Sequence, residues 1–143
     1  MGLNGEIRKS PKFIKREDYM KVTLPIKTKD ELKDGKRIVE YGEKTFELDL
    51  SLAAQMRWES RFYEQSAKED LVSYTERIKE HKELTMPVII SKLKTVYCYF
   101  DTDLTFLQFL KLFDFSNAEY TKKLVDKLTE VFEAINGEAV EKN

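Results

Sequence analysis

Few side chains in this chain of 143 residues could act as a nucleophile, a base or a metal ligand. Cys98 is the only cysteine and lies in the apolar run VYCYF, whereas His81, the only histidine, lies in the polar run KEHKEL. A reactive thiolate needs a cationic and accessible setting, so we interpret Cys98 as a buried thiol. One cysteine and one histidine in such different surroundings indicate neither a zinc site nor a catalytic pair.

The acidic residues are numerous, but their spacing favours ion pairing over catalysis. Five of them alternate with lysine and arginine at helical spacing: Glu64, Glu69, Glu76, Glu80 and Glu83. This pattern is typical of a solvated helix face. Asp101 and Asp103 lack the spacing of a calcium loop, and the sequence contains no glycine-rich phosphate loop. The sequence therefore predicts a protein that is not an enzyme, with no catalytic, cofactor-binding or metal-binding residues and no cofactor.

Composition and charge favour a single helical domain without a membrane segment. The chain is 41% apolar and 36% charged, with only three prolines and five glycines, which favours helices over a turn-rich β fold. No apolar run approaches the roughly 20 residues that cross a bilayer, and the first ten residues do not resemble a signal peptide. We expect a cytoplasmic protein that makes no membrane contact.

The net charge is −1, but the charged residues are unevenly distributed, with about +4 over residues 1–36 and −5 over the remainder. Residues 1–21 are basic and show no sustained periodicity, which predicts a flexible arm or an arm that docks on a neighbouring subunit. Residues 22–137 are expected to form one domain, followed by a polar tail at 138–143. The basic arm raises nucleic acid as a partner, but the acidic body would oppose a phosphate backbone.

The first part of the expected domain has the composition of strands. Val22–Ile26 reads as a strand that Pro25 confines to the edge of a sheet. Asp30–Lys36 reads as a turn. A β-hairpin is then predicted over residues 37–50, with its tight turn at Gly42.

Helical periodicity and capping signals cover residues 52–136. The expected helices are Leu52–Tyr63, Ala67–His81, one that begins after Thr85, a short one after Thr105, and a long one between Ser116 and Gly137. The third has the broadest apolar set, which predicts a central helix buried on more than one side. The predicted fold is mainly α, a bundle of about five helices with an N-terminal β-hairpin and an extended arm.

Two groups of aromatic residues are candidates for contact with a partner protein. In the first expected helix, an inward stripe of Leu52, Met56 and Tyr63 would leave Trp58 to one side among charged residues. An aromatic residue beside arginine suits an interface anchor, and the edge of the core is the alternative. The predicted partner-binding residues in this helix are Trp58, Arg61 and Phe62. In the corner before the last helix they are Phe113 and Phe115, which suit the core equally well.

Four stretches, in this order and spacing, carry a resemblance to a known family. They are FELDLSLAAQMRWESRF, LVSYTERI at Leu71–Ile78, SKLKTVYCYF at Ser91–Phe100 and FLQFLKLFDFSNAEYTKKLVDKLTEVF at 106–132. Together they cover about two thirds of the chain, residues 44–135. The most specific parts are LSLAAQMRWESRF and LFDFSNAEY. The chain resembles the tail assembly chaperones of long-tailed phages and prophages of Gram-positive bacteria.

The resemblance implies a binding role in the cytoplasm of the bacterial host. Proteins of this family coat the long tape-measure protein, keep it soluble and help to recruit major tail-tube subunits, and they are absent from the mature virion. Self-association along such a filament is expected. The alternative from a different class is a small regulator or nucleic-acid-binding protein that uses the basic N-terminal arm.

Overall fold

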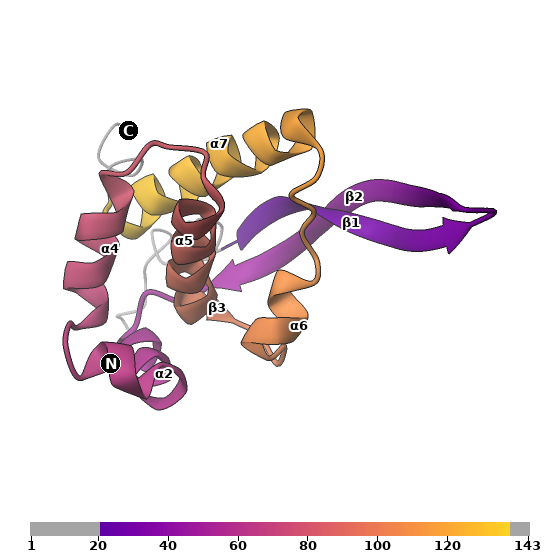
Figure 1. Cartoon of the computed structure of the whole chain (residues 1–143). Helices are drawn as coiled ribbons and strands as arrows, with labels where there is room; N and C mark the ends of the chain where they lie inside the picture. Colours follow the sequence, from indigo (N-terminus) through magenta and orange to yellow (C-terminus); the bar gives the residue numbers. More distant parts are fainter. Residues whose placement is uncertain (1–20, 138–143) are drawn as a thin grey trace, which may run out of the picture.

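The computed structural model describes residues 21–137 (Figure 1). These residues form six helices and a three-stranded antiparallel sheet, and they are 51% helical and 24% strand. The fold is therefore mixed α/β, and the prediction of a mainly α bundle with an N-terminal hairpin is wrong. The predicted arm at 1–21, apart from Lys21, and the predicted tail at 138–143 lie outside the described residues.

The sheet is built around one long hairpin. Strand β1 (Lys21–Lys33) pairs with β2 (Lys36–Leu48), and the short β3 (Phe100–Asp101) pairs with the end of β2, so the order is β1-β2-β3. Asp34 and Gly35 form the turn, with φ angles of 53° and 77°. Positive φ at both central residues is the type I′ geometry, whose twist matches the right-handed twist of the paired strands. The predicted turn at Asp30–Lys36 was therefore too long, because most of that segment is paired strand.

The hairpin predicted over residues 37–50, with its turn at Gly42, is also wrong. Gly42 lies inside β2, opposite Ile26. A Cβ at this position would lie 2.8 Å from Cγ2 of Thr28, which falls at the irregularity in the β1–β2 register. Close approach of the neighbouring strand therefore accounts for this glycine. Pro25 lies in β1, and the prediction of a sheet-edge strand there is confirmed.

The hairpin is buried at its base and exposed at its tip. Leu24 and Ile26 of β1 and Phe46 and Leu48 of β2 belong to the core. Every residue from 28 to 37 is exposed, and Figure 1 shows this half of the hairpin extending away from the helices.

The helices follow the hairpin along the chain. They are α2 (Leu52–Arg61), α3 (Tyr63–Ser66), α4 (Leu71–Lys79), α5 (Met86–Tyr99), α6 (Phe106–Leu110) and α7 (Ala118–Ile135). The capping box at Thr105 is confirmed, and Gly137, with a φ angle of 80°, follows the end of α7. Two helices begin later than predicted, because the side chains of Asp70 and Asn117 cap α4 and α7.

Helix α5 is the centre of the molecule, as its broad apolar set predicts. It packs against α2, α4, α6 and α7 and leads directly into β3. Phe100, at the start of β3, stacks on Phe46 of the hairpin base with ring centroids 4.8 Å apart, and both rings lie near Phe109 of α6. This aromatic cluster joins the sheet to the helices in one core.

A candidate protein-binding surface

Cys98 and His81, the two residues best suited to catalysis by type, lie in different surroundings. Cys98 is fully buried, as predicted, and burial raises the pKa of its thiol to about 12. His81 lies at the surface, with Nδ1 3.5 Å from Oε1 of Glu83. Among residues 21–137, no group of three or more His, Cys, Asp and Glu side chains is arranged to hold a metal ion.

The outer side of α2 carries large apolar residues that sequence periodicity places inside. Leu52 is 83% exposed and Met56 is 69% exposed, while Ala54 and Trp58 on the opposite side are buried. The predicted inward stripe of Leu52, Met56 and Tyr63 is therefore wrong. The helix instead buries the stripe that contains Trp58, whose ring removes more apolar area from water than either leucine or methionine.

Trp58 lies in the core, where each of its groups has a partner. Its Nε1 donates a hydrogen bond of 2.9 Å to the carbonyl oxygen of Glu69, just before α4. Its ring lies 4.8 Å from that of Tyr74 and 5.5 Å from that of Phe62, measured between centroids. In this structure Trp58 supports the surface from beneath and is not part of it.

Arg61 and Phe62 lie together beside a surface hollow. The guanidinium carbon of Arg61 is 4.9 Å from the ring centroid of Tyr97, and Nζ of Lys94 is 5.0 Å from that of Phe62. Phe62 is half-buried, with its ring edge-on to Phe106. The hollow has a volume of about 460 Å³ and is lined by Arg61, Phe62, Tyr63, Glu64, Gln65 and Lys94.

We define the α2–α3 surface as Leu52, Met56, Arg61, Phe62 and Tyr63. Tyr63, the first residue of α3, is 75% exposed. Leu52 and Met56 form the exposed apolar ridge of α2, and Tyr63 adds an exposed ring at the start of α3. Arg61 and Phe62 form a separate cation–aromatic group with Tyr97 and Lys94 of α5, beyond the end of that ridge. Such a combination suits contact with the apolar side of another protein segment, because exposed apolar groups lose contact with water when they are covered. In the sequence, this ridge is indicated by the spacing of Ala54 and Trp58, because burial of these two residues on one side of α2 turns Leu52 and Met56 outward.

The second predicted contact group, Phe113 and Phe115, flanks Asp114, the residue that attaches the hairpin to the segment between α6 and α7. Phe113 is buried, with its ring edge-on to Phe109 at 5.0 Å, and Phe115 is half-buried against the core. Between them, the buried Asp114 accepts hydrogen bonds from the Tyr41 hydroxyl at 2.6 Å and from Nη2 of Arg37 at 3.1 Å. This corner therefore makes an intramolecular contact that no pattern in the sequence predicts.

Further contacts hold the same part of the hairpin. Arg37 also donates through Nε and Nη2 to both carboxylate oxygens of Asp30, each at 2.8 Å. The rings of Tyr41 and Tyr120 stack at 4.6 Å, and the Tyr120 hydroxyl donates to the carbonyl of Pro25 at 2.7 Å. These contacts orient the hairpin relative to α7.

The electrostatics of this corner follow from burial and hydrogen bonding. Burial alone would raise the pKa of Asp114, but hydrogen bonds from Tyr41, Ser116 and Arg37 lower it to about 2. The hydrogen bond to Asp114 is also the main cause of a raised pKa for Tyr41. Hydrogen bonds from Arg37 and Lys27 hold the pKa of Asp30 well below its usual range. The carboxylates are therefore ionised at neutral pH and attract the hairpin's cationic side chains.

Comparison with protein-family models, with curated proteins and with solved structures gives no match. None of the helices in the described part of the chain combines the length and the apolar character that a membrane span requires.

Proposed function

We propose that this protein is a non-enzymatic tail assembly chaperone of a long-tailed phage or prophage, acting in the cytoplasm of the bacterial host. It binds the tape-measure protein, keeps it soluble, and helps to recruit major tail-tube subunits while self-associating along the filament. Two kinds of support lead to this proposal. They are the resemblance over residues 44–135 and the exposed apolar side chains of the α2–α3 surface.

The observation that carries the proposal is the exposure of Leu52, Met56 and Tyr63. Full burial of one such side chain contributes about 1.5–3 kcal/mol, so covering all three supplies several kcal/mol toward binding. Part of that gain is offset by the loss of translational and side-chain freedom. Repetition of the contact along a long partner would multiply a modest affinity for each copy.

The geometry suits a helical partner. Leu52 and Met56 are one turn apart on the same side of α2, so together they present a narrow apolar ridge. An amphipathic helix of the partner can lay its own apolar side along that ridge. A partner segment that extends past the end of α2 would meet Arg61 and Lys94 at the hollow, and their charges would attract its acidic residues.

The experiment is co-expression with a tape-measure fragment that is insoluble by itself. We expect the wild-type chain to keep the fragment in solution and to co-purify with it, and we expect Leu52→Glu to abolish both effects. Leu107→Glu is the matched control, since Leu107 is 62% exposed on α6 and the same charge is introduced away from the α2–α3 surface. Normal circular dichroism and thermal unfolding would show that both variants are folded.

The proposal fails if no such fragment binds the folded wild-type chain, or if Leu52→Glu and Leu107→Glu behave alike. The alternative, a regulator that uses the basic arm to bind nucleic acid, rests mainly on residues 1–20, which lie outside the described part of the chain. No structural observation favours it.

A further inference from the structure

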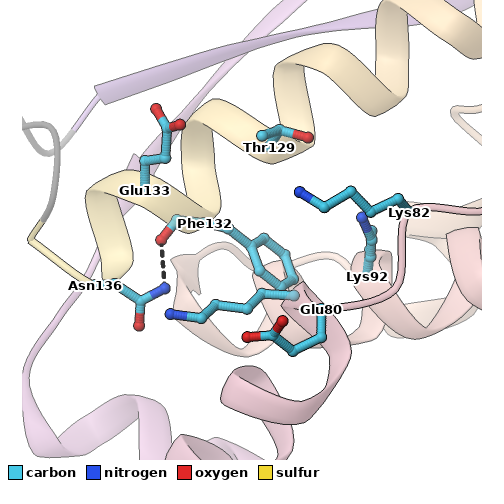
Figure 2. Close-up of a pocket in the computed structure, with 8 residues that line it drawn as sticks. Glu80, Lys82, Lys92, Thr129, Phe132, Glu133 and Asn136 are labelled. Carbon is cyan, nitrogen blue, oxygen red and sulfur yellow. Dashed lines mark hydrogen bonds between the residues drawn. The ribbon is translucent and has the colours of Figure 1, made fainter.

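A pocket of about 210 Å³ lies between the end of α4, the segment that follows it, α5 and α7. It is separate from the residues of the α2–α3 surface. The lining residues are Lys79, Glu80, Lys82, Lys92, Thr129, Phe132, Glu133 and Asn136. Figure 2 shows the side chains of Lys82 and Lys92 extending toward the space between α5 and α7.

Lys92 is the unusual member of this pocket, because it is a buried lysine whose ammonium group has no anionic partner among the described residues. The residue is 5% exposed. Its Nζ lies 5.9 Å from the ring centroid of Phe132, and it makes no hydrogen bond or ion pair with any of residues 21–137. Burial and the nearby charge of Lys82 lower the pKa of Lys92, and Glu83 opposes that change only in part.

A buried ammonium group without a partner is costly, since it has lost its hydration without gaining a counter-charge. The surrounding groups do not remove this cost. Glu80 and Glu133 line the pocket at distances from Lys92 Nζ greater than those of an ion pair, and in Figure 2 the carboxylate of Glu133 points away from the two labelled ammonium groups. The ring of Phe132 provides only a weak cation–π contact at this distance.

We propose that this pocket is a binding site for a single oxyanion group, a phosphate or a carboxylate, with Lys92 as its principal ligand. Lys82 supplies a second positive charge from the segment between α4 and α5. The third lysine of the lining, Lys79, is ion-paired with Glu76 at 3.1 Å, so the positive charge that faces the pocket comes from Lys82 and Lys92. The two glutamates disfavour a polyanion such as nucleic acid, whereas one oxyanion matches the size and the charge of the pocket.

The test uses the full chain and two probes, inorganic phosphate and acetate, at constant ionic strength with chloride as the reference salt. A ligand that binds only the folded state raises the unfolding temperature as its concentration exceeds Kd. We expect phosphate, acetate or both to stabilise the wild-type chain beyond the effect of chloride, and calorimetry to give one site per chain. The stronger probe identifies the preferred oxyanion.

Lys92→Met is the decisive variant, with Lys36→Met at the exposed hairpin tip as a control that changes the net charge equally. Loss of a charged ligand should weaken binding about tenfold or more in Lys92→Met and leave Lys36→Met unchanged. Without the probe, Lys92→Met should be at least as stable as wild type, because methionine removes a buried unpaired charge. That result would exclude unfolding as the cause of lost binding.

The oxyanion could also be a carboxylate of the chain itself, since Glu138 and Glu141 follow closely after α7 in the sequence. The double variant Glu138→Gln/Glu141→Gln separates the sources. Stronger binding of the probe by this variant would show that a tail carboxylate competes for the site, and unchanged binding would indicate an external oxyanion. The proposal is overturned if neither probe binds wild type or the double variant, or if Lys92→Met binds as well as wild type.

Discussion

In the corner between α6 and α7, the carboxylate of Asp114 is almost out of contact with water and yet ionised. Hydrogen bonds from Tyr41, Arg37 and Ser116 compensate for the lost hydration. Removing the charge leaves these donors directed at a weaker acceptor in a partly buried site. Asp114 is therefore the residue whose substitution should most directly loosen the attachment of the hairpin.

We expect Asp114→Asn to lower the free energy of unfolding by about 2 kcal/mol at neutral pH, because the amide cannot accept all of the existing hydrogen bonds. Urea denaturation of the full chain measures the change. Asp103→Asn is the matched control, since Asp103 is exposed, and it should alter stability by less than about 0.5 kcal/mol. Equal effects of the two substitutions would contradict this account of the corner.

The same contact predicts a dependence on pH. The pKa of Asp114 falls from an ordinary value of 3.8 to about 2 on folding, so its stabilisation is present above pH 3.8 and is lost as pH falls toward 2. The amide introduced by Asp114→Asn does not titrate. The stability difference between wild type and this variant should therefore be constant above about pH 5 and shrink below it. A difference that persists unchanged at about pH 2 would show that the charge of Asp114 is not its cause.

Which side of α2 is buried depends on the identity of a few residues, because helical periodicity does not distinguish the two sides. Leu52 and Met56 share one side, and Ala54 and Trp58 share the other, so helical spacing alone allows either to be buried. The hydrogen bond from Trp58 reaches the carbonyl of Glu69, just before α4, so the choice of the buried side depends on a contact outside α2. The sequence therefore identified the region of the candidate site, with Arg61 and Phe62, but could not identify which apolar residues remain exposed.

Among the secondary-structure elements, the helices were predicted better than the strands, because the signals that begin and end a helix lie within a few residues of each other. The Thr105 capping box and the glycine after α7 depend on neighbours within a few residues, and both were predicted correctly. The hairpin tip is polar on both faces, so it lacks the alternation that marks a half-buried strand. Residues 27–33 form a strand because they pair with β2, and this pairing cannot be read from the residues 27–33 themselves. This accounts for the incorrect mainly α prediction.

Gly42 gives a test at the scale of the hairpin. We expect Gly42→Ala to destabilise the chain by about 1 kcal/mol, because the new methyl group would lie too close to Cγ2 of Thr28. Thr28→Ser removes that methyl group and keeps the hydroxyl, which donates to the carbonyl of Glu40. In the Thr28→Ser background, alanine should be neutral or slightly stabilising, since glycine inside a strand is entropically unfavourable.

A double-mutant cycle with urea denaturation measures the coupling between the two positions. Additive effects of Gly42→Ala and Thr28→Ser would contradict the steric explanation. They would instead indicate that the glycine is needed for the local backbone conformation of β2.

At the scale of the whole molecule, the base and the tip of the hairpin should differ in stability although they belong to the same two strands. The base contributes Leu24 and Phe46 to a core shared with α5 and α6, so its hydrogen bonds open only when the core does. The tip beyond Thr28 has one two-stranded ladder, and within the described residues it is tied to the body by the side chain of Arg37, which donates to Asp114 and Ser116. An isolated two-stranded ladder is marginal in water.

Native-state hydrogen exchange should therefore resolve two classes of amide in the hairpin. We expect paired amides of residues 22–26 and 44–48 to exchange with the free energy of global unfolding, and those of residues 29–39 to exchange through local opening at a much lower free energy. Asp114→Asn should speed exchange in the tip by more than its effect on global stability explains, because Arg37 loses its ion pair with the body of the molecule and keeps only its hydrogen bond to Ser116. Strong protection of the tip at low protein concentration would contradict this view. Protection that appears only as concentration rises would mean that a second copy of the chain covers the tip, which is the self-association that the proposed chaperone function requires.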